Sequence, residues 1–260
     1  MPEKVLDSKP YAWERPGFDI KSLFDYKQAC ETSAMMVMRR TLFEQIDVLR
    51  QKRKDIRIID GGCGCGRWVI YLNRKGFNCV GVDANGQIIS KVKEFDASIR
   101  FEAADLRALP FPNNSFDLYY SFGVFEHFEE GMDKVLSEAR RILRPGGRLL
   151  FTVPTPNIIK RIFKPVRDIR RRFNSANHVY FREYRFGMKE LINIVKRAGF
   201  EIIEYGASDE VGMGLWEDFQ FLRAPGIFRL TPIGVKICKT FNFVSPWITN
   251  WGIIIVAEKA

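Results

Sequence analysis

An acid followed by closely spaced glycines occupies residues 60–66, with the sequence Asp-Gly-Gly-Cys-Gly-Cys-Gly. The apolar pair Ile58-Ile59 comes just before it, so a buried strand is expected to end at Asp60. Glycine permits positive φ and lets another molecule approach the backbone closely. The stretch is therefore predicted to turn a strand into a helix beside a flat, nucleoside-bearing ligand, although a tight turn without a ligand would use the same glycines.

Polar side chains follow three later strand patterns. Asp83 ends an apolar run 23 positions after Asp60, where a carboxylate can accept both ribose hydroxyls. Asp105 follows a third apolar run, where its carboxylate could accept from an adenine amino group, and Ser121 closes a fourth. In parallel sheets the ligand lies at the carboxyl ends of the strands, where the strand order reverses. These four loops are therefore predicted to converge on one site.

The glycine spacing argues against a nicotinamide or flavin dinucleotide. That fingerprint requires Gly-x-Gly-x-x-Gly or Ala, and its last position is Arg67 when counted from Gly62 and Val69 when counted from Gly64. A pyrophosphate also favours a helix N-terminus without a nearby carboxylate, whereas Asp60 supplies one. A ligand that carries an ammonium or sulfonium group tolerates this acid.

The elements that must position these residues alternate along the chain. Short apolar runs predict strands over residues 57–60, 78–83, 99–103, 115–121, 148–153, 201–205 and 251–257. Patterns of helical period predict helices over residues 67–75, 86–95, 131–143 and 188–198. This alternation is typical of an α/β fold with a doubly wound parallel sheet and helices on both faces.

The motifs, taken in order, resemble those of class I S-adenosylmethionine-dependent methyltransferases. The first motif of that family matches residues 60–66, its ribose-binding acid matches Asp83, and its adenine-proximal acid matches Asp105. Residues 116–128 are similar to its fourth-strand segment, and residues 143–147 to the turn that follows the next helix. The likeness covers about residues 56–206 and 250–258, which makes it far more specific than the first motif alone.

The resemblance implies a Rossmann-like methyltransferase fold, with a seven-stranded, mostly parallel sheet in the order 3-2-1-4-5-7-6 and strand seven antiparallel. It also implies an enzyme whose cofactor is S-adenosyl-L-methionine. The cofactor-binding residues carried over from the motifs are Asp60, Gly61, Gly62, Gly64, Gly66, Asp83, Ala84, Asp105, Leu106 and Ser121.

The remaining parts of the chain are expected to select the methyl acceptor. We predict an N-terminal arm and helical lid over residues 1–50, irregular over residues 1–19, and a methyltransferase domain over residues 51–260. Insertions are expected after strands five and six, at about residues 155–186 and 207–247. These segments lack the regular alternation of the core, so we interpret them as the lid and the substrate pocket.

Two histidines are candidates for acid–base chemistry. His127 follows strand four and could be a general base, but the pair Glu126-His127 could instead pack and hydrogen-bond its loop. His178 precedes the helix at residues 188–198 and could lie beside the acceptor, or could be an exposed loop residue. Some quinone-pathway relatives hold a metal with an acid three residues before such a pair. That position is Gly123 here, so no metal is predicted.

The chain is basic, with 41 Lys and Arg against 31 Asp and Glu and a net charge of +10. Much of the excess lies in residues 158–173, where basic side chains interleave with apolar ones at helical spacing. This pattern favours contact with an anionic membrane or a lipid-linked substrate; a solvated surface is an alternative, and nucleic acid is less favoured.

The sequence predicts a cytoplasmic protein, peripheral at the inner membrane face if the basic segment binds lipid. The N-terminus has no apolar signal core, and the odd number of cysteines, five, suggests no disulfide framework. The predicted function is methyl transfer to a small-molecule or lipid-linked acceptor by in-line displacement. The alternatives are an RNA or protein methyltransferase, or a cofactor-binding module without catalysis. The acceptor atom and the oligomeric state are not encoded in these patterns.

Overall fold

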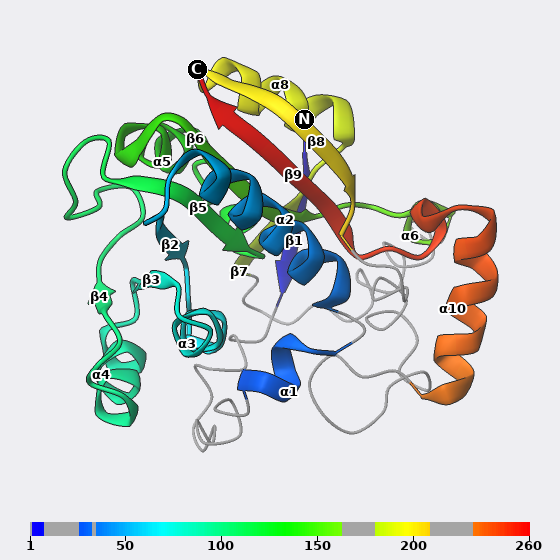
Figure 1. Cartoon of the computed structure of the whole chain (residues 1–260). Helices are drawn as coiled ribbons and strands as arrows, with labels where there is room; N and C mark the ends of the chain where they lie inside the picture. The colour runs from blue at the N-terminus through cyan, green and yellow to red at the C-terminus, as the bar shows by residue number, and fades with distance from the viewer. Residues whose placement is uncertain (1, 8–25, 33–34, 163–179, 209–230) are drawn as a thin grey trace.

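The computed structural model describes residues 2–7, 26–32, 35–162, 180–208 and 231–260, and these contain a seven-stranded sheet (Figure 1). The sheet order is β4-β3-β2-β5-β6-β9-β8. The first five of these strands are parallel, and β9 is antiparallel to both of its neighbours. The order 3-2-1-4-5-7-6 is thereby confirmed. The strands are β2 (Arg57–Gly61), β3 (Asn78–Asp83), β4 (Phe101–Ala103), β5 (Phe116–Phe122), β6 (Leu143–Pro154), β8 (Phe200–Ala207) and β9 (Gly252–Lys259).

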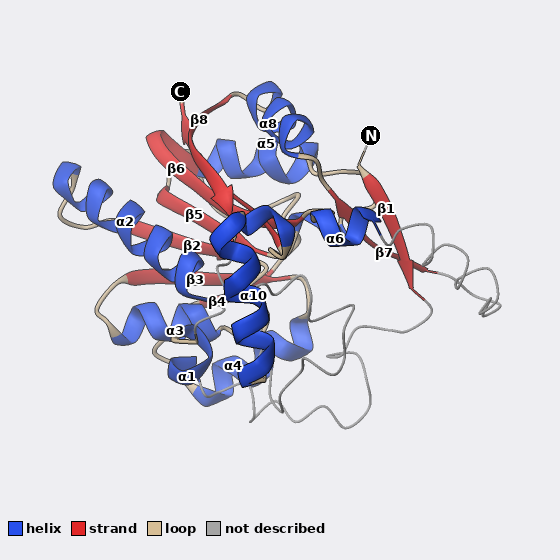
Figure 2. Cartoon of the chain, turned by 90° about the vertical axis from the view of Figure 1, so that its right-hand side faces the viewer, coloured by secondary structure: helices blue, strands red, loops and turns tan. Residues whose placement is uncertain are grey.

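Helices cover both faces of the sheet because both faces are apolar. Successive side chains of a strand point to opposite faces, so Ile58 and Ile59 of β2 belong to two different cores. Figures 1 and 2 show the helices on the two sides. One core includes side chains from α2 (Met36–Lys52), α3 (Arg67–Arg74) and α4 (Gly86–Phe95), and the other from α5 (Asp133–Ile142) and α8 (Met188–Arg197).

The helix α2 belongs to the main core. Its residues Leu42 and Ile46 are completely buried and lie in one cluster with Leu118, Leu150 and Val256 from three strands of the sheet. This part of residues 1–50 therefore packs on the sheet. A lid role for the N-terminal region stays a prediction, and residues 8–25 and 33–34 lie outside the described residues.

The prediction of an irregular arm was wrong for residues 3–7. The strand β1 (Glu3–Asp7) pairs antiparallel with β7 (Tyr180–Arg185), which lies in the segment predicted as the first insertion. The two strands form a small second sheet. The sequence pattern that would predict β1 is weak because the strand is short and its partner β7 is distant in the chain. The pairing ties the N-terminus to the insertion after strand five.

The other differences are local. The fifth strand begins at Leu143, earlier than predicted, because Leu143 pairs with Phe116 before an irregularity in the register. The described parts of the two insertions also contain α6 (Ile158–Ile162), α10 (Pro232–Val244) and the 3₁₀ turn η6 (Pro246–Ile248). The helix α1 (Tyr26–Cys30) lies against α3, and a second 3₁₀ turn, η4 (Phe125–His127), follows β5.

A buried carboxylate fastens the opposite end of the sheet from the glycine-rich turn. Asp117 of β5 accepts from the backbone N–H of Arg57 at 2.9 Å, at the start of β2. It also accepts from the guanidinium groups of Arg53 at 3.0 Å and Arg144 at 2.6 Å. The carboxylate therefore joins the end of α2 to three neighbouring strands.

Replacing this carboxylate is expected to destabilise the fold. Asp117→Ala should lower the free energy of unfolding by about 2 kcal/mol, because the Arg57 N–H loses its partner and two cations lose theirs. The measurement is urea unfolding followed by circular dichroism. Glu102→Ala, which removes an exposed ion pair with Arg100, is the matched control and should change stability by less than about 0.5 kcal/mol. Equal effects of the two variants would contradict this role.

Candidate nucleoside-binding site

The glycine-rich turn folds tightly against the end of β3. The backbone N–H groups of Gly62 and Cys63 both donate to the carbonyl oxygen of Val82, at 2.8 and 2.9 Å. Gly62, Gly64 and Gly66 have φ values of 82°, 52° and 72°. These are left-handed conformations that side chains other than glycine rarely adopt, so the glycines are needed to turn β2 into α3.

The three glycines differ in what surrounds them. A Cβ on Gly62 would lie 2.5 Å from Val124, and a Cβ on Gly66 would lie 2.5 Å from Phe101, so the protein itself fills both spaces. A Cβ on Gly64 would meet nothing within 4 Å. The packing of the protein therefore does not require the open side of Gly64, and that side is available to a ligand.

Asp83 joins the glycine-rich turn to the loop after β3. Its Oδ2 accepts from the backbone N–H of Gly64 at 2.8 Å, and its Oδ1 accepts from the N–H of Asn85 at 2.9 Å. Each carboxylate oxygen has two lone pairs, so each retains capacity for another donor. The carboxylate is only partly buried, which leaves it able to accept from a ribose diol at the predicted position.

Asp60 is a buried acid at the same edge of the sheet. Its pKa is raised to about 8, chiefly by burial, while a hydrogen bond with Tyr120 opposes the rise and the nearby Asp83 adds to it. Asp60 is therefore largely protonated at neutral pH, and a cation placed beside it would favour its charged form. Sequence reasoning missed Tyr120, although strand alternation places it on the same face, directly opposite Asp60 in the register.

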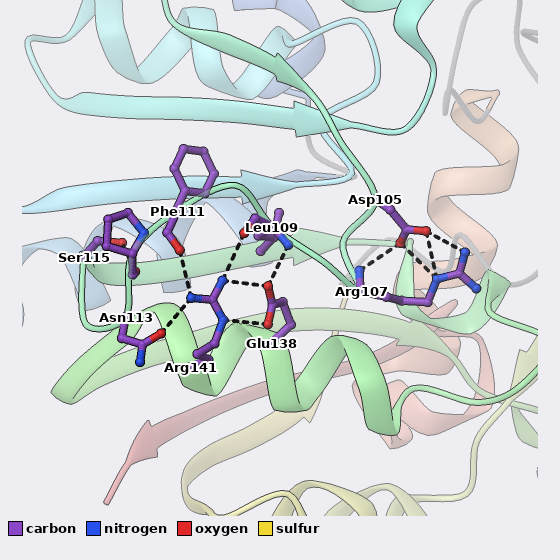
Figure 3. A network of polar contacts seen from close by, with 9 residues as sticks. Asp105, Arg107, Leu109, Phe111, Asn113, Ser115, Glu138 and Arg141 are labelled. Atoms are coloured by element: carbon purple, nitrogen blue, oxygen red, sulfur yellow. Dashed lines mark hydrogen bonds and ion pairs between the residues drawn. The ribbon is translucent and has the colours of Figure 1, made fainter.

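Asp105 lies next to this site but is engaged within the protein. Its carboxylate accepts from Arg107 Nε and Nη2 at 2.6 to 3.0 Å, as Figure 3 shows, and the arginine holds the pKa of Asp105 below its usual value. The same figure shows how Arg141 of α5 binds the carbonyls of Leu109 and Phe111 and fixes the loop after β4. A contact from Asp105 to an adenine amino group stays a prediction.

The remaining predicted residues lie around the turn with different roles in the fold. Ser121 is completely buried and donates from Oγ to the carbonyl oxygen of Gly61 at 2.6 Å, so it links β5 to β2. Leu106 is buried in the core beside α5, whereas Ala84 is exposed beside Asp83. The structure thus gathers the turn, Asp83 and Ser121 at one edge, and the assignment of each to a cofactor stays a prediction.

His127 is held against the small second sheet. Its Nδ1 lies 2.7 Å from the carbonyl oxygen of Arg182 in β7, and because a carbonyl only accepts, Nδ1 carries the proton. Burial lowers the pKa of His127, so the ring is neutral at pH 7. Its Nε2 lies 3.9 Å from Glu126, whose own pKa burial raises well above the usual value. The ring therefore binds the loop to β7, and a backbone hydrogen bond with Gly123 also acts on it.

His178 lies outside the described residues. Residues 163–173, which make up most of the basic segment at 158–173, also lie outside them. Within the part of the chain that the structure describes, no three His, Cys, Asp or Glu side chains are grouped to hold a metal ion. The prediction that no metal takes part stays a prediction.

Comparison with known proteins shows which families this chain resembles. Residues 59–151 match a family model described as a methyltransferase domain. A probable S-adenosylmethionine-dependent methyltransferase of Mycolicibacterium smegmatis is 30% identical over 145 residues, which is 56% of this chain and 52% of the relative. A malonyl-[acyl-carrier protein] O-methyltransferase of Pectobacterium atrosepticum is 27% identical over 114 residues, or 44% of this chain and 45% of that protein.

Residues 59–151 therefore form a methyltransferase domain, and the chain resembles class I S-adenosylmethionine-dependent methyltransferases. A crystal structure of a methyltransferase of this kind from Methanosarcina mazei has the same fold, with a TM-score of 0.56, 19% identity, and coverage of 80% of this chain and 93% of that one. The chain spans about half the length of the curated relatives that it matches.

The residues at this edge of the sheet fit the cofactor of these relatives, S-adenosylmethionine. Gly64 has an open side at the turn, Asp83 has acceptor capacity for two hydroxyls, and Asp60 tolerates a cation because a positive charge offsets the cost of its burial. A dinucleotide would instead bring a pyrophosphate to a turn that begins at this acid. The donor set at this edge therefore suits a nucleoside with a cationic tail.

The role of Asp83 can be tested by calorimetry. Asp83→Ala should weaken the binding of S-adenosylhomocysteine at least about tenfold, because two charge-assisted hydrogen bonds to the ribose are lost. Glu102→Ala, on the neighbouring strand β4, should bind as the wild type does. Unchanged affinity of Asp83→Ala for S-adenosylhomocysteine would show that the Asp83 carboxylate does not bind the cofactor.

Binding of the cofactor is also expected to release a proton. Asp60, with a pKa of about 8, holds a proton at pH 7, and the cationic groups of S-adenosylmethionine should lower that pKa on binding. The buffer takes up the released proton. The apparent binding enthalpy at pH 7 should therefore differ between phosphate and Tris by up to the difference between the ionisation enthalpies of the two buffers. In Asp60→Asn the difference should disappear. The same enthalpy in both buffers for the wild type would show that Asp60 does not change its protonation.

Proposed function

We propose that this protein transfers a methyl group from S-adenosylmethionine to a small-molecule or lipid-linked acceptor. The observation that carries the proposal is the bridge from Asp83 to the backbone of Gly64 and Asn85 at the carboxyl edge of the sheet. This bridge holds the glycine-rich turn beside a carboxylate that retains acceptor capacity for a ribose. When bound, S-adenosylmethionine supplies an electrophilic methyl carbon that a nucleophile attacks in line, with the bonding electrons leaving on sulfur.

The residues of the chain contribute mainly by binding and orientation. Asp83 and the turn would fix the nucleoside, and Asp60 would balance the positive charge of the methionine portion. Holding the acceptor in line can supply about 7–11 kcal/mol at the ideal limit, so methyl transfer asks for few chemical groups. A general base is required only if the acceptor is a weak acid such as a hydroxyl.

The acceptor is the finer part of the proposal. A small-molecule or lipid-linked acceptor is supported by the interleaved basic and apolar residues at 158–173, which suit an anionic membrane surface. The matching O-methyltransferase of Pectobacterium atrosepticum is named for malonyl-[acyl-carrier protein], so the acceptor of one relative is a small acyl group on a carrier, which supports the small-molecule class. All five cysteines are free thiols, which supports the proposed cytoplasmic location. The proposed peripheral contact at the inner membrane face is based on the basic residues at 158–173.

A search for the acceptor tests the proposal directly. The purified protein is incubated with fractions of a cell extract and S-adenosylmethionine labelled in the methyl group, and labelled products are identified by mass. Label in a small molecule or lipid, lost in Asp83→Ala, is the expected result. Label confined to RNA or protein would overturn the acceptor class. Cofactor binding with no labelled product in any fraction would leave only a binding module.

His127 can be tested by a variant that separates its two roles. His127→Asn retains a donor for the Arg182 carbonyl but has no basic nitrogen, whereas His127→Ala loses both. If His127 is the base, His127→Asn should lower kcat by about 100-fold or more with little change in cofactor affinity or melting temperature. With the labelled acceptor as substrate, nearly full activity of His127→Asn would restrict His127 to fastening the loop to β7.

A further inference from the structure

The helix α10 presents large apolar side chains to solvent. Ile233 is 70% exposed, Phe243 is 94% exposed and Val244 is 75% exposed. Figure 1 shows α10 at one edge of the molecule, beyond the ends of the sheet strands. Apolar side chains this exposed over so short a helix are typical of a contact surface rather than of scattered surface residues.

The exposed side chains of α10 are ordered by the helical period. Ile233, Phe241 and Val244, together with the half-buried Ile237, recur at spacings of four, four and three, so they lie on one face. Lys236, Lys239 and Phe243 repeat at three and four along the adjoining face, and both lysines are exposed. Gly234 and Cys238 are buried on the side turned toward the protein. The helix is therefore amphipathic toward the outside, with an apolar stripe beside a basic one.

A second short helix has the same character. Ile158, Arg161 and Ile162 of α6 are exposed, and α6 contacts η6, which in turn contacts α10. Figure 2 shows α6 and α10 on the face turned toward the viewer. Neither α6 nor α10 includes an Asp or Glu, and their exposed cations are Arg161 of α6 and Lys236 and Lys239 of α10. The two helices thus form one surface that combines exposed apolar groups with positive charge alone.

We propose that the exposed faces of α10 and α6 dock the protein on the surface of an anionic lipid bilayer. An apolar stripe flanked by lysines suits a helix that lies in the interface, with its apolar side chains among the acyl chains and its cations at the headgroups. At 13 residues α10 is about 20 Å long, shorter than the hydrocarbon core of about 30 Å, so it lies along the surface.

The charge of the surface decides among the partners. A second copy of the chain would bring lysine against lysine across a two-fold interface, where like charges repel. A nucleic acid would satisfy the lysines but would leave Ile233 and Val244 without an apolar partner. An anionic bilayer satisfies both the charged and the apolar groups. The proposal deepens the proposed function, since a lipid-linked acceptor resides in such a bilayer, but it can be measured without methyl transfer.

Flotation with vesicles tests the surface. The full-length protein is mixed with vesicles of phosphatidylcholine alone, or of phosphatidylcholine with about one third phosphatidylglycerol, and the bound fraction is measured after centrifugation. Binding is expected only to the anionic vesicles and should weaken with salt. Lys236→Glu with Lys239→Glu should lower the partition coefficient at least about tenfold, because two cations that attract the anionic headgroups become anions. Phe243→Ser with Val244→Ser should have a similar effect through lost apolar burial.

Matched control variants lie on α4, which Figure 1 places on the far side of the molecule from α10. Lys91→Glu with Lys93→Glu reverses two exposed lysines, and Phe95→Ser removes an exposed aromatic side chain. These variants should float as the wild type does apart from a small effect of net charge. Calorimetry with S-adenosylhomocysteine checks that every variant retains its fold, because α10 is separate from Asp83.

The outcomes distinguish this surface from the proposed function. Equal flotation of the α10 and α4 variants, or no flotation of the wild type, would overturn the docking surface while leaving methyl transfer intact. A dimer that dissociates in Phe243→Ser with Val244→Ser, without vesicle binding, would make the partner a second copy. RNA binding that needs the α10 lysines, again without vesicle binding, would make it a nucleic acid. Lipid binding through α10 by a protein that methylates nothing would retain the surface and overturn the function.

Discussion

The bridge made by the Asp83 carboxylate is the interaction on which the site depends. A turn with three glycines in left-handed conformations is costly to order, because glycine loses more conformational entropy on folding than other residues. Asp83 compensates by accepting one backbone N–H from this turn and one from the loop after β3. The glycine-rich turn after β2 and the loop after β3 are therefore held at a fixed distance, with the Asp83 carboxylate between them.

The sheet order explains why these groups meet. β2 lies between β3 and β5, so the reversal of strand order falls at the carboxyl end of β2, where the turn begins. Asp60 is then buried opposite Tyr120, and Ser121 reaches the carbonyl of Gly61. At the other end of the same strands Asp117 joins β2, β5 and the start of β6. Stability and binding are thus assigned to opposite ends of three parallel strands.

Much of the central sheet could be predicted from the sequence because its strands are fully buried apolar runs that end in recognisable polar residues. The strand at Asn78–Asp83 and the helix at Gly86–Phe95 have the predicted bounds. The strand order came from the family resemblance, since no local pattern encodes it. β1 was missed because a five-residue strand gains its stability from a partner some 170 residues away in the chain, a contact that local patterns do not report.

The candidate site was predictable in part for the same reason. Motif spacing identified Asp60, Asp83 and the glycines, but it could not reveal that Arg107 engages Asp105 or that His127 fastens β7. Those contacts depend on side-chain positions in loops. The exposed face of α10 was also missed, because an apolar helix in an irregular region looks the same in sequence whether it is buried or exposed. Only the solvent exposure of the side chains in the structure distinguishes an exposed apolar helix from a buried one.

The most direct test of the account is a crystal structure of the protein with S-adenosylhomocysteine. The account predicts both ribose hydroxyls within hydrogen-bonding distance of the Asp83 carboxylate, with the open side of Gly64 facing the ligand and its amino group on the side of Asp60. A nucleoside bound elsewhere, or a ribose turned away from Asp83, would contradict the central claim that this carboxylate and the glycine-rich turn together form the cofactor site.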